Sequence, residues 1–229
     1  MICIHMGLMK TGSTFFQSRV FPQLKEVTYV HGIESFYGGR FFSFGPMRPV
    51  IVSNEGMTGS WYKDEECGKD YFERFQSAVE NVLTLFNRPK VIVVFREPAS
   101  FIRSSYKQFL HENGTKTWEQ FFPFPELSTT YLDQFKFSKF IEYAQSRFEP
   151  DQLLLLDYNE LKTNPADFLD RVLRFSLDEQ TYAANSELKL DKLKKSNAAV
   201  SQEHERYLIL SNKLNAQFKK AFGLLTCAH

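Results

Sequence analysis

Cysteine is scarce in this chain, and long apolar runs are missing from it. The three cysteines, Cys3, Cys67 and Cys227, are scattered and follow neither a metal-binding spacing nor a disulfide framework. Free thiols are typical of a reducing compartment. No stretch approaches the roughly 18 apolar residues that span a membrane. The first residues also lack the basic segment and apolar core of a signal peptide. We therefore expect a cytoplasmic protein without a membrane span.

An excess of basic charge is missing as well. Lys and Arg together number 28 against 27 for Asp and Glu, so the net charge is +1. A general nucleic-acid binder usually carries a clear basic excess, so no nucleic-acid partner is expected. A local basic pocket for a small anion is compatible with this balance.

The length and composition suit a single globular domain. A chain of 229 residues can bury a sufficient core, so one domain over residues 1–229 is predicted. With 43% hydrophobic and 24% charged residues, the chain is not of the disordered type. Its 24 phenylalanines predict an aromatic-rich interior.

Short apolar runs alternate with segments of helical periodicity along the chain. This alternation predicts parallel strands joined by crossover helices, in one three-layer α/β domain. Strands are expected at 2–5, 27–31, 49–53, 90–95 and 152–156. Helices are expected at 13–24, 71–86, 98–111, 137–148, 165–175 and 201–222. Segments 114–124 and 183–197 are expected to be loops. The run at 90–95 is apolar on both faces, which indicates a central strand.

A glycine-containing loop, residues 7–14, joins the first expected strand to the first expected helix. Open α/β sheets bind ligands at this position, beyond the carboxyl ends of their strands. Gly7 and Gly12 let the backbone turn tightly and approach a ligand. Amides at a helix N-terminus favour an anion, and Lys10 adds a positive charge. Further hydrogen-bond donors are the hydroxyls of Thr11, Ser13 and Thr14.

The loop differs from the nucleoside-triphosphate pattern G-x-x-x-x-G-K-[ST]. Its lysine, Lys10, stands two residues before the second glycine instead of directly after it. The 90–95 strand is followed by Arg96, where an Asp could hold magnesium. These two differences indicate an anion that is bound without magnesium, and no metal site is predicted.

Arg96 and Ser104 form a second candidate anion site. Ser104 follows Arg96 by eight residues and falls about two turns into the helix that Pro98 opens. The arginine offers a planar fork of donors to a phosphate, and the serine offers a short hydroxyl. We expect both side chains to reach one phosphate group.

These motifs resemble the sulfotransferases that use 3′-phosphoadenosine 5′-phosphosulfate. That family carries a 5′-phosphosulfate loop of roughly Lys-Thr-Gly-Thr-Thr-x-Leu-Gln, and residues 10–17 read Lys-Thr-Gly-Ser-Thr-Phe-Phe-Gln. It also carries a 3′-phosphate motif with the spacing of Arg96 and Ser104. The stretch 153–165, four leucines followed by a polar segment that ends in Asn-Pro, is a third likeness. The resemblance covers roughly residues 1–215. It implies a P-loop-like fold, this donor as co-substrate and sulfuryl transfer to a hydroxyl or amine.

The transfer reaction needs charge stabilisation on the leaving oxygen and a base for the acceptor. Lys10 suits the first role, and Glu55, directly after the 49–53 strand, suits the second. A histidine such as His5 or His31 is the alternative base. The resemblance also suggests a late basic contact to the 3′-phosphate. Lys195 lies where that contact falls, although the Arg-Lys-Gly form of the vertebrate cytosolic branch is absent.

The acceptor is the part that the sequence does not specify. Variable loops form such pockets, and segments 32–48 and 114–131 as well as Trp61 and Tyr62 are candidate walls. A small molecule or a carbohydrate with a hydroxyl or amine group fits their aromatic content. Two other functions stay open at this point: a P-loop nucleotide-dependent kinase and a non-catalytic nucleotide-binding module. The oligomeric state is unknown.

Overall fold

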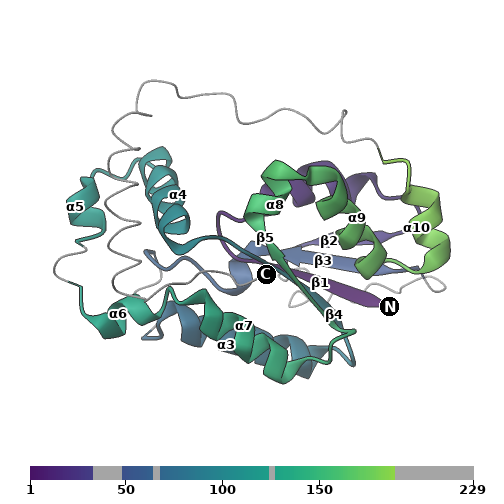
Figure 1. Ribbon diagram of the computed structural model, residues 1–229, viewed down its shortest axis with the longest axis horizontal. Coiled ribbons are helices and arrows are strands. Elements are labelled where there is room, and N and C mark those ends of the chain that lie inside the picture. Colours follow the sequence, from purple (N-terminus) through teal and green to yellow (C-terminus); the bar gives the residue numbers. More distant parts are fainter. Residues whose placement is uncertain (33–47, 64–67, 124–126, 189–229) are drawn as a thin grey trace. The chain divides into compact units, whose positions relative to one another are not determined.

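The computed structural model describes residues 1–32, 48–63, 68–123 and 127–188 of the chain (Figure 1). These residues fall into two compact units. One contains residues 1–96 and 137–188, and the other contains residues 97–136. The single domain expected over 1–229 stays a prediction.

The first unit is built on a sheet of five parallel strands in the order β2-β3-β1-β4-β5. The strands are β1 (Ile2–Gly7), β2 (Thr28–His31), β3 (Val50–Asn54), β4 (Lys90–Phe95) and β5 (Leu153–Asp157). The β-branched runs of β3 and β4 are buried on both sides, as the pattern predicts for central parallel strands. The predicted α/β sheet is confirmed, and every predicted strand is present within three residues of its expected bounds.

Helices cover both faces of this sheet, which makes three layers (Figure 1). One face is covered by the helical segment α1-η1-η2 and by α8, α9 and α10. Their bounds are Ser13–Phe15, Phe16–Val20, Phe21–Gln23, Tyr158–Thr163, Pro165–Ser176 and Glu179–Asn185. The other face is covered by α3 (Tyr71–Leu85) and α7 (Phe137–Arg147). A short 3-10 helix, η3 (Glu55–Met57), follows β3.

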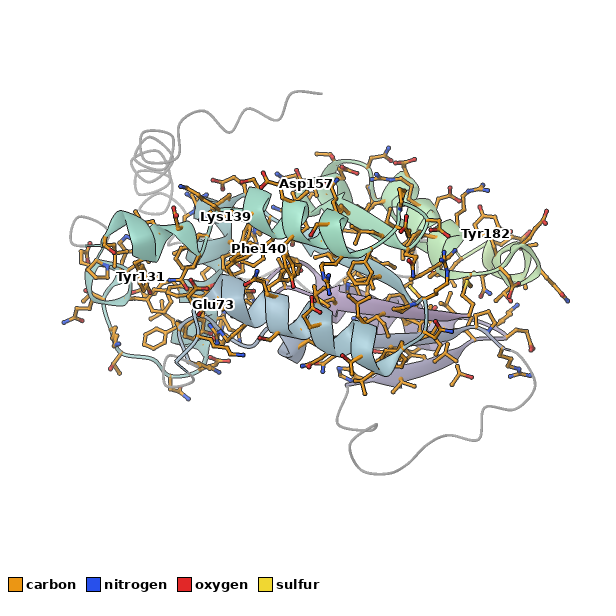
Figure 2. The ribbon with its side chains drawn as sticks, turned by 90° about the horizontal axis from the view of Figure 1, so that it is seen from below. Glu73, Tyr131, Lys139, Phe140, Asp157 and Tyr182 are labelled. Atoms are coloured by element: carbon orange, nitrogen blue, oxygen red, sulfur yellow. The ribbon has the colours of Figure 1, made fainter. Side chains whose placement is uncertain are left out.

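Aromatic rings fill the layer between α3, α7 and the sheet. The Phe140 ring of α7 lies 4.9 Å from the Phe75 ring and 5.0 Å from the Phe72 ring of α3. Figure 2 shows Phe140 between the ribbons of these two helices. Phe75 in turn contacts Phe95 at the end of β4. The phenylalanine content therefore does form an aromatic-rich interior, because large rings bury much area per residue.

The second unit contains α4 (Pro98–His111), α5 (Trp118–Phe121) and α6 (Thr129–Asp133). The carboxylate of Glu97 accepts the amides of Ala99 and Ser100, and Pro98 occupies the first turn, so α4 begins where the sequence predicts. Segment 114–124 was expected to be a loop, and this is wrong at α5. A capping box between Thr117 and Gln120 starts that helix.

Three further expectations need correction or lie outside the described residues. The first helix is not a regular α-helix over 13–24, because it passes through a π segment into a 3-10 turn. Pro22 lacks the amide that would bond the fourth residue before it, so a regular helix cannot continue there. The expected loop at 183–197 overlaps the end of α10, which Asp178 caps. The helix expected at 201–222 lies outside the described residues.

In the described ranges, none of the helices combines the length and the apolar content needed to cross a membrane.

A buried polar pair, His5 and Ser53, lies inside the first unit. The two residues are register partners in the pairing of β1 with β3, and His5 Nδ1 lies 2.7 Å from Ser53 Oγ. Gln17 Nε2 donates to the same hydroxyl at 3.1 Å. The His5 ring lies against the rings of Phe16 and Phe21. Burial in this apolar surrounding lowers the pKa of His5 from 6.5 to about 4.

His5 should therefore make stability depend on pH in the acid range. Between pH 6.5 and about 4 the unfolded chain binds a proton at this residue and the folded chain does not. The free energy of unfolding should fall as the pH is lowered through this window, by about 3 kcal/mol in total from this residue. Urea unfolding at a series of pH values measures it. His5→Gln should show a shallower slope over the same window, and equal slopes for the two proteins would contradict the assignment.

Candidate active site

The loop after β1 is a tight, preformed turn. Lys10 and Gly12 both have left-handed backbone conformations, with φ of 62° and 90°. A lysine in this region is strained, and such strain concentrates at functional sites. The buried Thr11 hydroxyl donates to the Leu8 carbonyl at 2.5 Å and closes the turn. Thr11 therefore holds the loop in this structure, while Thr14 is exposed at the start of the helix.

The two glycines of the loop let other groups come very close. A Cβ added to Gly7 would lie 2.2 Å from Ser13 Oγ. A Cβ added to Gly12 would lie 3.0 Å from a Leu161 methyl carbon and 3.1 Å from the Tyr158 ring. Any side chain would therefore push the loop away from the helix start and from α8. Gly12 is also the N-cap residue of α1, where it supplies no side-chain cap to the first amides.

Ser13 presents a buried hydroxyl at the beginning of the helix. The residue is 2% exposed, and its Oγ has no hydrogen-bond partner among the described residues. A buried hydroxyl without a partner is costly and calls for an explanation. An anion seated on the loop would supply the missing acceptor.

Arg96 is held against the loop. It follows β4, the strand next to β1 in the sheet, and its Nη1 donates to the Lys10 carbonyl at 2.8 Å. Its guanidinium carbon also lies 4.7 Å from the centre of the Tyr158 ring. The register of β4 with β5, which pairs Phe95 with Asp157, places Arg96 beside Tyr158. The structure thus brings Arg96 and the Lys10 loop together at neighbouring strand ends.

Glu55 also lies at this edge of the sheet. The strand pairing sets Met6 opposite Asn54, so Glu55 follows directly beside Gly7. The Asn54 side chain accepts the Gly56 amide at 2.8 Å and turns the chain at this point. The Glu55 residue is exposed, and its Cβ would lie 3.3 Å from a Cβ on Gly7. The candidate base is therefore adjacent to the loop and open to solvent.

Tyr71, the first residue of α3, is a contact that sequence reasoning missed. Burial raises the pKa of Tyr71 to about 12, and the nearby Thr58 side chain and Met9 backbone act in the opposite direction. The negative charge of Glu55 raises this pKa further, so Glu55 lies within electrostatic reach of the phenol. Tyr71 therefore links the loop to the segment that carries Glu55. No motif marks it, because a tyrosine at a helix start resembles any core residue.

Tyr158 and Lys162 of α8 are the other contacts that were missed. The Lys162 Nζ lies 4.7 Å from the centre of the same Tyr158 ring that Arg96 covers. Partial burial lowers the pKa of Lys162, the charge of Arg96 lowers it further, and Asp157 opposes both. Asp157 is labelled in Figure 2 at the end of β5. The sequence did contain a signal for these residues: they follow a predicted strand, as the Lys10 loop does.

Two of the expected donor contacts, Ser104 and Lys195, stay sequence predictions. Ser104 belongs to α4 in the second unit, so its pairing with Arg96 stays a prediction. Lys195 lies outside the described residues. His5 is 1% exposed and bonded to Ser53, so it does not serve as a base, and His31 is exposed at the end of the edge strand β2. The described ranges hold no group of three or more metal-ligating side chains, and metal-free function stays a prediction.

In α/β proteins, a lysine loop after a central parallel strand and an arginine after the next strand form an arrangement suited to phosphate groups. Residues 70–220 match the sulfotransferase domain family, so the chain belongs to this family. The protein is accordingly a sulfotransferase, as the resemblance predicted. The matched range contains Arg96 and Lys162, whereas the Lys10 loop and Glu55 precede it. This membership also excludes the alternative of a nucleotide-dependent kinase.

Solved sulfotransferase structures share the fold. The chain is similar to mouse sulfotransferase SULT7A1 complexed with PAP, with 17% identity and a TM-score of 0.53 over 96% of this chain and 82% of the mouse chain. A sulfotransferase from Alicyclobacillus acidocaldarius matches with 11% identity and a TM-score of 0.49, over 95% of this chain and 94% of that one. The likeness to the mouse structure shows the fold of the chain. No curated protein sequence matches the chain.

The contact between Gly7 and Ser13 gives a test of the loop. Gly7→Ala should destabilise the protein by about 1–3 kcal/mol, because the new methyl group would collide with Ser13 Oγ. The double variant Gly7→Ala/Ser13→Ala should recover part of the loss, since the hydroxyl is gone. Urea unfolding of the wild type, both single variants and the double variant measures the coupling. Additive effects of the two substitutions would show that the loop does not adopt this packing.

Proposed function

We propose that this sulfotransferase takes its sulfuryl group from 3′-phosphoadenosine 5′-phosphosulfate and passes it to a hydroxyl or amine. The loop fits the 5′-phosphosulfate because it combines a cradle that a Cβ would fill with the buried, unpartnered Ser13 hydroxyl. The bound PAP of the mouse neighbour, which is the desulfated donor, supports the same choice. In this proposal the donor-binding residues of the loop are those at positions 10–14.

Arg96 is proposed for the 3′-phosphate, together with Ser104. Its guanidinium is already oriented by the Lys10 carbonyl and the Tyr158 ring, so little conformational freedom is lost on binding. The role of Ser104 at this phosphate is inferred from its sequence spacing to Arg96 alone. Lys195 also stays a sequence prediction for this phosphate.

Lys10 and Glu55 are proposed for the chemical step. The acceptor oxygen or nitrogen forms a bond to sulfur while the bond from sulfur to the bridging phosphate oxygen breaks. Lys10 stabilises the negative charge that develops on this leaving oxygen, and Glu55 takes the proton of the acceptor. The observation that carries the proposal is the position of Glu55 beside Gly7, which places base and loop next to one another. The exposure of Glu55 leaves it accessible to an acceptor from solvent.

The acceptor class is proposed to be a small molecule or a carbohydrate. Trp61, one candidate wall residue, is 3% exposed, so Tyr62 is the better placed of the two for contact with an acceptor. Segment 32–48 falls largely outside the described residues, as do 124–126 of the other candidate wall.

Two substitutions test the roles in the chemical step. With ³⁵S-labelled donor and a panel of hydroxyl and amine acceptors, Glu55→Gln should lower kcat by about 10²–10⁴-fold, since the acceptor loses its base. Lys10→Ala should lower kcat by about 10²–10³-fold, because the charge on the leaving oxygen is no longer stabilised. Glu149→Gln, an exposed carboxylate before β5 at the opposite edge of the sheet, is the matched control and should keep wild-type turnover.

Three results would contradict the proposal. Full turnover in Glu55→Gln would show that Glu55 is not the base. Full turnover in Lys10→Ala would show that Lys10 does not stabilise the leaving oxygen. Tight binding of PAP by the wild type without transfer to any acceptor in the panel would instead favour the non-catalytic module.

A further inference from the structure

Three positively charged residues follow neighbouring strands at the carboxyl edge of the first unit, and one of them has no role in the proposed function. Lys10 follows β1, Arg96 follows β4 and Lys162 belongs to α8, which follows β5. These three strands are neighbours in the order β1-β4-β5. Arg96 and Lys162 lie equally far, 4.7 Å, from the centre of one tyrosine ring. Lys162 is thus held at this edge by the same ring as Arg96.

The Tyr158 ring that carries both cations is fixed in place. Two of its ring carbons would lie 3.1 and 3.5 Å from a Cβ on Gly12, so the ring packs directly on the loop backbone. Leu161, from the next turn of α8, packs on the same glycine. An aromatic face attracts a cation and here orients two of them. The positions of Arg96 and Lys162 relative to the loop are therefore set by packing before any ligand binds.

The charges around Lys162 are not balanced. Partial burial and the neighbouring Arg96 both disfavour its ammonium form, and Asp157 is the acid that opposes them. The Asp157 carboxylate also accepts the Asn159 amide at 2.8 Å, where it caps α8. At Lys162, the acid that opposes the charge of Arg96 is Asp157, which is already engaged as the cap of α8. A group with two negative charges would relieve the repulsion between Arg96 and Lys162.

We propose that Lys162 binds the 3′-phosphate of the donor together with Arg96. This inference rests on the proposed function, because it assumes the bisphosphorylated donor. The 5′ group is assigned to the loop after β1, and Arg96 is the residue proposed for the 3′-phosphate. Lys162 lies over the same Tyr158 ring as Arg96, at the same distance from its centre. Lys162 therefore shares the phosphate of its neighbour Arg96.

The test compares two nucleotides that differ only in the 3′-phosphate. Isothermal titration calorimetry of the full chain gives Kd values for PAP and for 5′-AMP. Lys162→Ala should weaken PAP binding roughly tenfold to a hundredfold, as expected for a lost charge-assisted contact, and leave 5′-AMP binding within about twofold. Lys162→Arg should keep most of the affinity for PAP, since it preserves the charge. Lys25→Ala, an exposed lysine before β2 at the opposite edge of the sheet, removes the same charge and should change neither Kd.

The outcomes separate this inference from the proposed function. Equal weakening of PAP and 5′-AMP by Lys162→Ala would overturn the inference, because it would show a structural role through Tyr158 and the loop. An unchanged Kd for PAP in Lys162→Ala would also overturn it, and in both cases the proposed donor would stand. A wild-type protein that binds PAP no better than 5′-AMP would overturn the assignment of the 3′-phosphate to Arg96 and to Lys162 alike.

Discussion

The parallel pairing of β1 with both β3 and β4 is the constraint on which the candidate site depends. Parallel strands end at the same edge of a sheet, and their register decides which residues meet there. Because Met6 pairs with Asn54 and Gly7 pairs with Val94, the segments after these strands begin side by side. Glu55 and Arg96 thereby reach the loop from its two flanks. The absence of a side chain at Gly7 then allows the helix start to close on the strand end.

Support for this edge comes from buried polar contacts beneath it. The Ser53 hydroxyl accepts a hydrogen bond from the Gln17 side chain and lies within hydrogen-bond distance of the His5 ring. This one hydroxyl therefore joins β1, β3 and the first helical segment just below the loop. Tyr71 lies near the loop backbone at Met9 and near Thr58, in the segment after Glu55. His5, Ser53, Thr58 and Tyr71 are each at most 1% exposed. Rigid support of this kind keeps catalytic groups in position, which lowers the entropy that binding must overcome.

The electrostatic character of the site is local. The chain as a whole carries a net charge of +1, so long-range attraction of anions is weak. The positive charge is instead concentrated at the ends of three adjacent strands, in Lys10, Arg96 and Lys162. A small, highly charged anion is recognised by such a cluster, whereas a long polyanion would need a broad basic surface. The family membership of the chain agrees with this reading.

The sequence by itself determined the elements and the loop. Apolar runs such as 90–95 and the glycines and lysine of 7–14 are local patterns. They identified the strands, the family and the strand-end position of Arg96 and Glu55, and they predict an anion site in the loop. Short helices such as α5 and α10 were not predicted, because caps and packing stabilise them and they are too short to show a clear periodicity. Only the tertiary structure decided which strand ends are neighbours. Strand order and register depend on contacts between residues far apart in the chain, and these brought Tyr158, Lys162 and Tyr71 to the loop.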